Sequence, residues 1–166
     1  MVENMFREMR LKREALEETA VKEILENGTS GVLALQGEDG YPYAVPLSYF
    51  YDGKDKIYFH GAKKGYKMDM VKQCDKASFC VIGQDQIVPK EYTSYFKSVI
   101  AFGKVRIMED EKEIRSAIEK MADKYHPAGT AEERNAAIDS EWNILGMIEF
   151  QIEHISGKQA RELIKK

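Results

Sequence analysis

This sequence of 166 residues has only two cysteines, four prolines and one tryptophan, and it has no long apolar run. Cys74 and Cys80 do not form a CxxC pair, so a disulfide framework is not expected. No apolar segment approaches the roughly 20 residues that a membrane-spanning helix needs, and the N-terminus lacks the apolar stretch of a secretory signal. We therefore expect a cytoplasmic protein with reduced thiols and no membrane contact.

Neither sign of charge dominates, because 25 Lys and Arg residues are set against 28 Asp and Glu residues, for a net charge of -3. This balance gives no general attraction to nucleic acid, although a local basic patch is compatible with it. An oligonucleotide-binding barrel is therefore a weak alternative, since it needs basic and aromatic residues interleaved on one sheet face. The length fits a single domain, 1–166, that can bury a core without disulfides or a metal.

Five segments are expected to be helical, one of them a short helix within residues 56–72 that is described below. Residues 13–27 place apolar side chains along one helical stripe and end at an Asn-Gly pair. Asp110 and Thr130 are each followed three residues later by Glu, a spacing typical of the capping box that begins a helix. These two helices should end near Tyr125 and Glu141. A short C-terminal helix is expected at about 158–166.

Six segments have the apolar patterns of strands, namely residues 31–36, 41–51, 56–61, 77–83, 95–108 and 145–155. Pro42 and Pro46 cannot donate to a strand ladder, so the second segment should be an edge or irregular strand. Residues 84–93 are expected to form a loop. Antiparallel strands in blocks, with helices inserted between them, predict a mainly β (α+β) fold: a small closed or partly open barrel with peripheral helices.

Residues 56–72 are the most informative segment. Ile57 and Phe59 alternate with Tyr58 and His60, so the two pairs should lie on opposite faces of a strand. This strand leads into a turn with three lysines, Lys63, Lys64 and Lys67, and then into a short amphipathic helix. Ammonium groups beside a helix N-terminus favour a phosphate, so the segment predicts a phosphorylated small-molecule ligand. Spacing alone, however, favours a solvated basic loop.

His60 has no Cys or carboxylate partner at metal-ligand spacing, and His126 and His154 lie far along the chain, so no metal site is expected. A lone histidine at a strand end is most often a hydrogen-bonded structural residue. The alternatives are a proton donor to a reduced substrate or a ligand of haem or a metal, because imidazole titrates near neutral pH.

Three segments in order, residues 37–48, 57–65 and 95–103, carry a family resemblance. With them, the sequence resembles the pyridoxamine 5'-phosphate oxidase-like flavoproteins, in particular the branch that includes the nitroimidazole-resistance (Nim) reductases. The resemblance implies an FMN-binding split β-barrel that works as a homodimer and holds FMN in grooves at the subunit interface. The Arg-rich phosphate motif of true pyridoxamine phosphate oxidases is not apparent, which argues against that reaction.

Carried over by position, the resemblance also implies site residues. The strand Val45, Pro46, Leu47 and Ser48 should offer backbone groups to the polar edge of the isoalloxazine ring. The end of the next strand should contact the ring and the ribityl chain through Tyr58, Phe59, His60, Gly61 and Ala62. Among these, His60 should be the catalytic residue in the substrate pocket. Lys64 and Lys67 should hold the phosphate, with Lys63 as a weaker candidate. Ser98 and Val99, up to Ile100, should lie near the flavin, from the same subunit or its partner.

The resulting hypothesis is an FMN-dependent oxidoreductase that acts on a small organic molecule, such as a nitroimidazole. The alternative is a flavin- or haem-binding protein without turnover that serves storage, sensing or haem handling.

Overall fold

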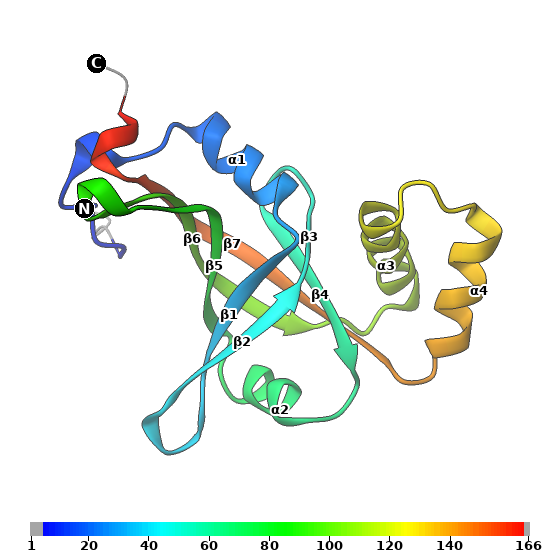
Figure 1. Ribbon diagram of the computed structural model, residues 1–166. Coiled ribbons are helices and arrows are strands. Elements are labelled where there is room, and N and C mark those ends of the chain that lie inside the picture. The colour runs from blue at the N-terminus through cyan, green and yellow to red at the C-terminus, as the bar shows by residue number, and fades with distance from the viewer. Residues whose placement is uncertain (1–4, 165–166) are drawn as a thin grey trace.

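A computed structural model describes residues 5–164 (Figure 1). Seven strands form one antiparallel sheet: β1 (Ser30–Gln36), β2 (Pro42–Ser48), β3 (Phe50–Tyr51), β4 (Lys56–Ala62), β5 (Lys76–Val88), β6 (Thr93–Ile107) and β7 (Leu145–Gln159). The α-helices are α1 (Glu18–Asn27), α2 (Tyr66–Gln73), α3 (Glu111–Tyr125) and α4 (Ala131–Glu141). The predicted class, mainly β with peripheral helices, is confirmed.

The strand order is β2-β1-β5-β6-β7-β4-β3, so β2 and β3 lie at opposite ends of the sheet. Only Tyr49 separates these two strands in the sequence, and the sheet must therefore curl until its ends meet. Cα atoms of β2 and β4 approach within 8 Å, but no strand pairing joins them. The result is a barrel with one open seam, which we call the split. The prediction of an edge strand at Pro42 and Pro46 is confirmed.

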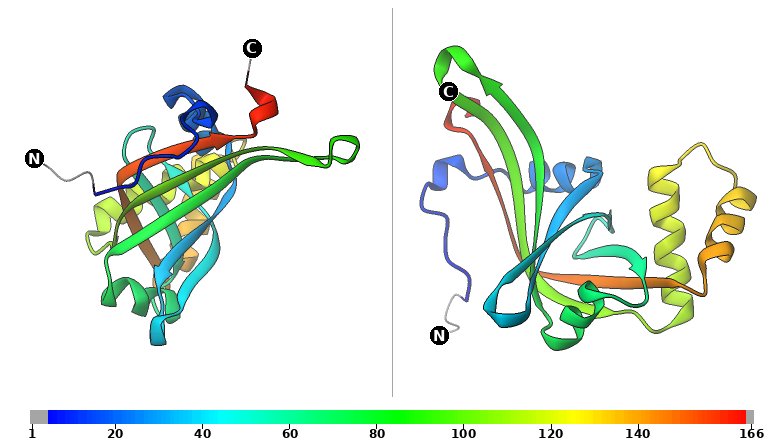
Figure 2. Two further views of the ribbon diagram at one scale, coloured as in Figure 1. Left: turned by 90° about the vertical axis from the view of Figure 1, so that its left-hand side faces the viewer. Right: turned by 60° about the horizontal axis from the view of Figure 1, so that its bottom comes forward.

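The loop predicted at residues 84–93 is wrong, because β5 and β6 stay paired as far as Val88 and Thr93. Only Pro89–Glu91 forms the turn, as a short 3-10 helix, followed by Tyr92 in the left-handed region at φ 50°. The polar residues of this segment do not interrupt pairing, since the hairpin projects beyond the barrel and both of its faces meet solvent (Figure 2). The backbone hydrogen bonds of the ladder do not depend on an apolar pattern, and the Tyr95 hydroxyl adds a bond to Glu91 at 2.8 Å.

Both terminal helix predictions need correction. The helix predicted at 13–27 begins only at Glu18, and a 3-10 turn, Lys12–Glu14, precedes it. The helix predicted at 158–166 is absent from residues 158–164, because β7 continues to Gln159 and pairs there with Lys97. A 3-10 turn at Arg161–Leu163 follows, and residues 165–166 lie outside the described range.

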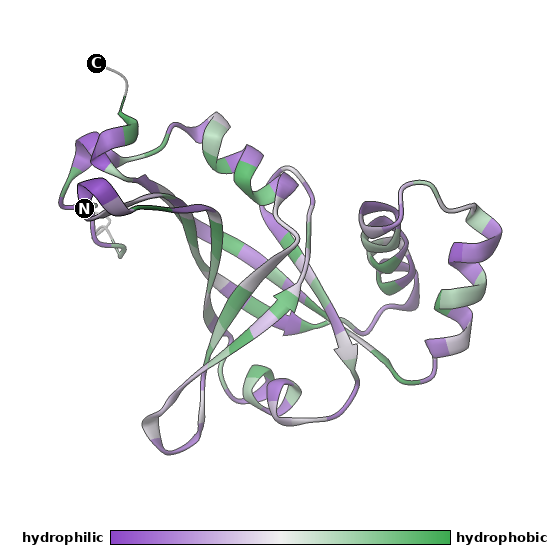
Figure 3. Cartoon of the chain, in the orientation of Figure 1, coloured by the Kyte–Doolittle hydropathy of each residue, from purple (hydrophilic) through white to green (hydrophobic). Residues whose placement is uncertain are grey.

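The main core fills the barrel, and α1 and α2 cover its two ends (Figure 1). Hydrophobic residues concentrate on the strands, whereas α4 and the turns are largely hydrophilic (Figure 3). The buried side chains of the wall include Leu33, Ile57, Phe59, Phe79, Val99 and Phe150, and the helices add Val21, Leu25, Met68 and Met70. Ile57 and Phe59 point inward and their neighbours outward, as the alternation predicted.

Helices α3 and α4 form a hairpin that packs on the outside of the barrel, where a second apolar cluster includes Ile118, Met121 and Met147. Both helix starts were predicted correctly. Thr130 forms a full capping box with Glu133. The Asp110 carboxylate accepts from two backbone N–H groups, but Glu113 does not reciprocate, because it pairs with Arg106 instead.

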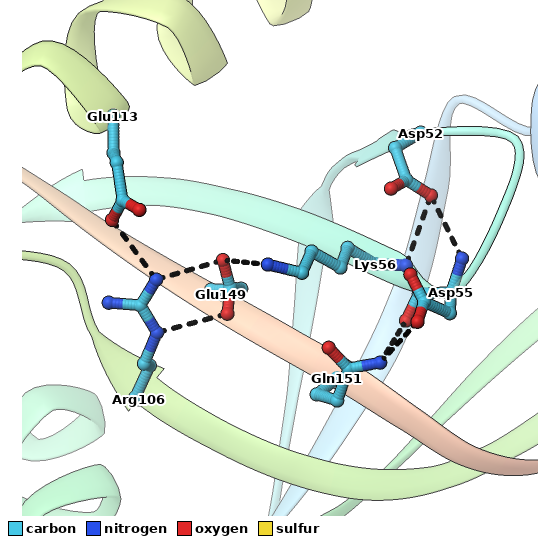
Figure 4. Close-up of polar contacts among 7 residues, drawn as sticks. All are labelled: Asp52, Asp55, Lys56, Arg106, Glu113, Glu149 and Gln151. Carbon is cyan, nitrogen blue, oxygen red and sulfur yellow. Dashed lines mark hydrogen bonds and ion pairs between the residues drawn. The ribbon is translucent and has the colours of Figure 1, made fainter.

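The α3 packing also covers a carboxylate, Glu149, which is only 6% exposed on the outer face of β7. The Glu149 carboxylate accepts from Arg106 Nε at 2.9 Å and from Lys56 Nζ at 3.1 Å (Figure 4). Burial opposes ionisation, but these hydrogen bonds outweigh it and hold the pKa of Glu149 below its usual value. The ion pairs therefore join β4, β6 and β7 beneath α3.

Candidate functional site

The split exposes backbone groups from two strands. β2 is an edge strand, so alternate N–H and C=O groups along its outer side have no strand partner. β4 pairs with β7 along its whole length, but its pairing with β3 involves only Ile57 and Tyr58. From Phe59 to Ala62, one side of β4 therefore also lacks a strand partner. The two segments predicted to contact a flavin, 45–48 and 58–62, thus border the same seam.

A cavity of about 360 Å³ lies between the split and the α3–α4 hairpin, and we call it the chamber. Ser48 at the end of β2 and His60 on β4 line its barrel side. Its opposite side is apolar and consists mainly of Ile118, Met121, Ala122, Ala137 and Ile138. The structure thus brings Ser48 and His60 together and adds helix residues for which the sequence offered no signal beyond an apolar stripe.

His60 has a defined hydrogen-bond partner on α3. Its Nδ1 lies 3.1 Å from the Sδ atom of Met121. A thioether can accept but not donate, so this contact requires the proton on Nδ1. In a neutral ring Nε2 is then a hydrogen-bond acceptor. Burial, and secondarily the positive charge of Lys67, lower the pKa of His60, which favours the neutral ring at pH 7.

Lys67 reaches back from α2 over the end of β4. A Cβ atom at Gly61 would lie 2.7 Å from the Lys67 Nζ atom, so the ammonium group packs directly over Gly61. Lys67 is half-buried, and burial lowers its pKa. Within residues 5–164, no carboxylate forms an ion pair with it. A half-buried ammonium group in this state favours an anionic ligand.

Lys67 belongs to the first turn of α2, and the N-terminus of this helix has no side-chain cap. Gly65 precedes the helix at φ 129°, a conformation that other residues rarely adopt. The first helical hydrogen bond runs from Asp69 N to Gly65 O, so the earlier amides have no acceptor within the helix. Tyr66 anchors this end, because its hydroxyl accepts from Glu38 N at 3.0 Å. Lys64 is exposed in the same turn. The arrangement has the charge and the free donors that a phosphate requires.

Not every predicted side chain can touch a ligand. Phe59 and Val99 are buried in the barrel, and Val45 and Leu47 pack against the same core. At Phe59 and Val99 only the backbone can contact a bound molecule. Pro46 and Ser48, in contrast, are exposed on the outer face of β2.

Ser98 lies far from His60 along the sheet. His60 pairs with Met147 on β7, whereas Ser98 pairs with Lys158. These partners are eleven residues apart, roughly 35 Å along an extended strand at about 3.3 Å per residue. Within one chain, Ser98 and His60 therefore do not line the same cavity.

No group of three or more His, Cys, Asp or Glu side chains within the described residues is arranged to hold a metal ion. Over the same range, no helix is both long enough and apolar enough to cross a membrane.

The lowered pKa of His60 leads to a testable prediction of how the stability of the protein depends on pH. Because the folded state disfavours the charged ring, stability should be fully present above the unfolded pKa of about 6.5 and should fall as the pH drops toward the lower folded value. NMR titration of the His60 ring protons should give a midpoint below 6.5, and His60→Gln should flatten the stability loss between pH 7.5 and 5. A midpoint at or above 6.5 would contradict the assignment.

The fold recurs in solved structures of low sequence identity. A candidate 5-nitroimidazole antibiotic resistance protein from Bacteroides thetaiotaomicron is 19% identical, with a TM-score of 0.74 over 87% of this chain and 86% of that one. A conserved hypothetical protein from Mycobacterium tuberculosis is 17% identical, with a TM-score of 0.79 over 96% and 94%. An FAD and haem binding protein from Mycobacterium smegmatis is 16% identical, with a TM-score of 0.69 over 92% and 76%.

These similarities establish the split-barrel fold. Among curated proteins, none matches the sequence significantly. The family model described as pyridoxamine 5'-phosphate oxidase matches residues 17–159, which include every strand and the α1–α4 helices. The chain therefore belongs to the pyridoxamine 5'-phosphate oxidase family.

Proposed function

We propose that this protein binds FMN along the split and uses it to reduce or oxidise a small organic molecule. The observation that carries the proposal is the half-buried ammonium group of Lys67, held over Gly61 beside the α2 N-terminus without a carboxylate partner among the described residues. Lys67, Lys64 and the first-turn amides would hold the phosphate. The family match and a neighbour described as binding FAD support a flavin at this site.

The remaining roles follow from position. Unpaired backbone groups of β2 and β4 would bind the polar edge of the flavin ring, because they are fixed donors and acceptors along the split. A bound flavin supplies hydride or electron transfer, and the protein sets orientation and access. The apolar wall of α3 and α4 would exclude water from the substrate, and His60 would hold the substrate through its ring.

We further propose that the protein forms a homodimer. Exposed apolar residues form adjoining rows on the outer sheet face, because Val32 pairs with Cys80 and Cys80 with Ile100. Val32, Ile100 and Phe102 are each about 40% exposed. Ser98 lies on the same face of β6, so a partner docked on this patch could present it to the flavin.

One observation favours a second candidate function, haem binding. A neutral imidazole with a free Nε2 beside an apolar cavity is what axial haem ligation requires, and His60 has this form. The neighbour from Mycobacterium smegmatis is described as binding haem as well as FAD.

The proposed redox function can be tested on the purified protein. It should be yellow, its reduced form should be reoxidised by a nitroimidazole, and His60→Ala should slow this step by at least about tenfold while changing flavin affinity less. His126→Ala is the matched control. A yellow protein that no nitro compound reoxidises would contradict the redox proposal. A Soret band that disappears in His60→Ala would favour haem binding instead.

The phosphate site can be tested by removing its charges. Lys64→Ala combined with Lys67→Ala should weaken FMN affinity by at least about tenfold, because two charge-assisted contacts are lost. Lys72→Ala combined with Lys76→Ala removes the same charge from exposed positions and serves as the control. FMN affinity would be measured by fluorescence titration of the flavin-free protein. Equal affinities in the two double variants would rule out the anchor role.

The dimer can be tested by light scattering. Ile100→Glu places a charge in the outer-face patch, so it should produce monomers and reduce flavin retention together. Ile144→Glu alters another exposed isoleucine, 60% exposed in the α4–β7 connection, and should do neither. A wild-type monomer that still holds flavin would overturn the interface proposal.

A further inference from the structure

The chamber has an unusual balance of charge for a site beside two lysines. Its lining residues include one carboxylate, Glu141, and one imidazole, His60, but no Lys or Arg. The positive charge of Lys67 lies on the barrel side, over Gly61. In contrast, the neighbouring cavity of about 370 Å³ beneath α3 is lined by charged groups of both signs, namely Lys56, Lys112, Lys120, Asp52, Glu113 and Glu149. The chamber is therefore the less charged of the two cavities.

We propose that the chamber binds an uncharged, largely apolar ring compound that donates one hydrogen bond to His60 Nε2. This inference rests on the proposed function, because it makes the chamber the substrate compartment beside the flavin. The two nearest charges, Glu141 in the chamber wall and Lys67 over Gly61, have opposite signs, so the charges select neither an anion nor a cation. An ion of either sign would lose its hydration against the apolar helices.

The hydrogen-bond direction follows from Met121. Its thioether sulfur accepts from Nδ1 of His60 at 3.1 Å, which leaves Nε2 as the free acceptor of the neutral ring. A ligand with an N–H or O–H group satisfies this acceptor, whereas an isosteric ligand without one leaves it unpaired. Met121 is thus a positioning residue that acts through His60.

The chamber is held in shape before any ligand binds. At the end of α3, the Tyr125 hydroxyl accepts from Tyr49 N at 2.9 Å, and Lys124 Nζ donates to Gly28 O at 2.6 Å. These bonds attach the end of α3 to the α1–β1 connection and to the residue that connects β2 and β3. An ion pair between Arg134 and Asp123 at 3.0 Å attaches α4 to α3. A preformed wall limits the entropic cost of binding.

Two adjacent alanines provide a matched test. Both are exposed on α4, but only Ala137 lines the chamber. Ala137→Phe should fill it, while Ala136→Phe adds the same ring outside. Binding would be measured by calorimetry on the full-length protein with three probes: indole, benzofuran, which replaces the N–H by oxygen, and benzoate, an anion.

Indole should bind, and Ala137→Phe should weaken its binding at least tenfold, against less than twofold for Ala136→Phe. Benzofuran should bind about fivefold more weakly than indole, since one neutral hydrogen bond is lost. Benzoate should not bind measurably. Met121→Leu keeps the side-chain volume but removes the sulfur acceptor, so it should bring the indole and benzofuran affinities together.

Equal effects of the two alanine substitutions, or benzoate binding as tight as indole binding, would overturn the inference. Flavin absorbance of the same samples tests the proposed function separately. Reducible flavin without the probe pattern would contradict the chamber inference alone. The probe pattern in protein that cannot hold flavin would support the chamber chemistry and contradict the proposed function.

Discussion

Closure of the sheet through a single residue is the constraint on which the rest of the structure depends. β2 and β3 lie at opposite ends of the strand order, and Tyr49 alone connects them. Tyr49 is fully buried, its hydroxyl donates to Leu25 O at 2.7 Å, and its backbone N–H donates to Tyr125. The connection is therefore fixed from α1 on one side and from α3 on the other. Because it brings β2 beside β4 without pairing them, the barrel gains a seam of unpaired backbone groups.

The α3–α4 hairpin gives this seam its chemical character. It is inserted between β6 and β7 and covers the outer face of the wall next to the split. The cost is a buried carboxylate, Glu149, which Arg106 and Lys56 neutralise. The gain is an apolar boundary on one side of His60, while Lys67 and the α2 N-terminus lie on the other. Two neighbouring environments, one apolar and one positively charged, thus meet at a single strand end.

Much of this arrangement follows from local patterns in the sequence. Alternation at Ile57 to His60 predicted which side chains face the core, and Thr130 and Asp110 predicted both helix starts. Long-range contacts could not be predicted in the same way. Met121 lies 61 residues from His60, and only packing of the helix hairpin brings them together. The separation of Ser98 from His60 depends on strand register, which the family resemblance alone did not provide. The loop prediction at residues 84–93 was wrong because the backbone pairing of β5 and β6 needs no apolar pattern.

The prolines of β2 have a further consequence for how the protein behaves in a crowded solution. An open strand edge is a template for pairing with any other extended chain, and such pairing leads to aggregation. Pro42 and Pro46 remove donors from that edge and interrupt the regular ladder that an incoming strand would need. A compact ligand needs only a few of the remaining groups, so it can still bind. The edge of β2 is thus a poor template for another extended chain.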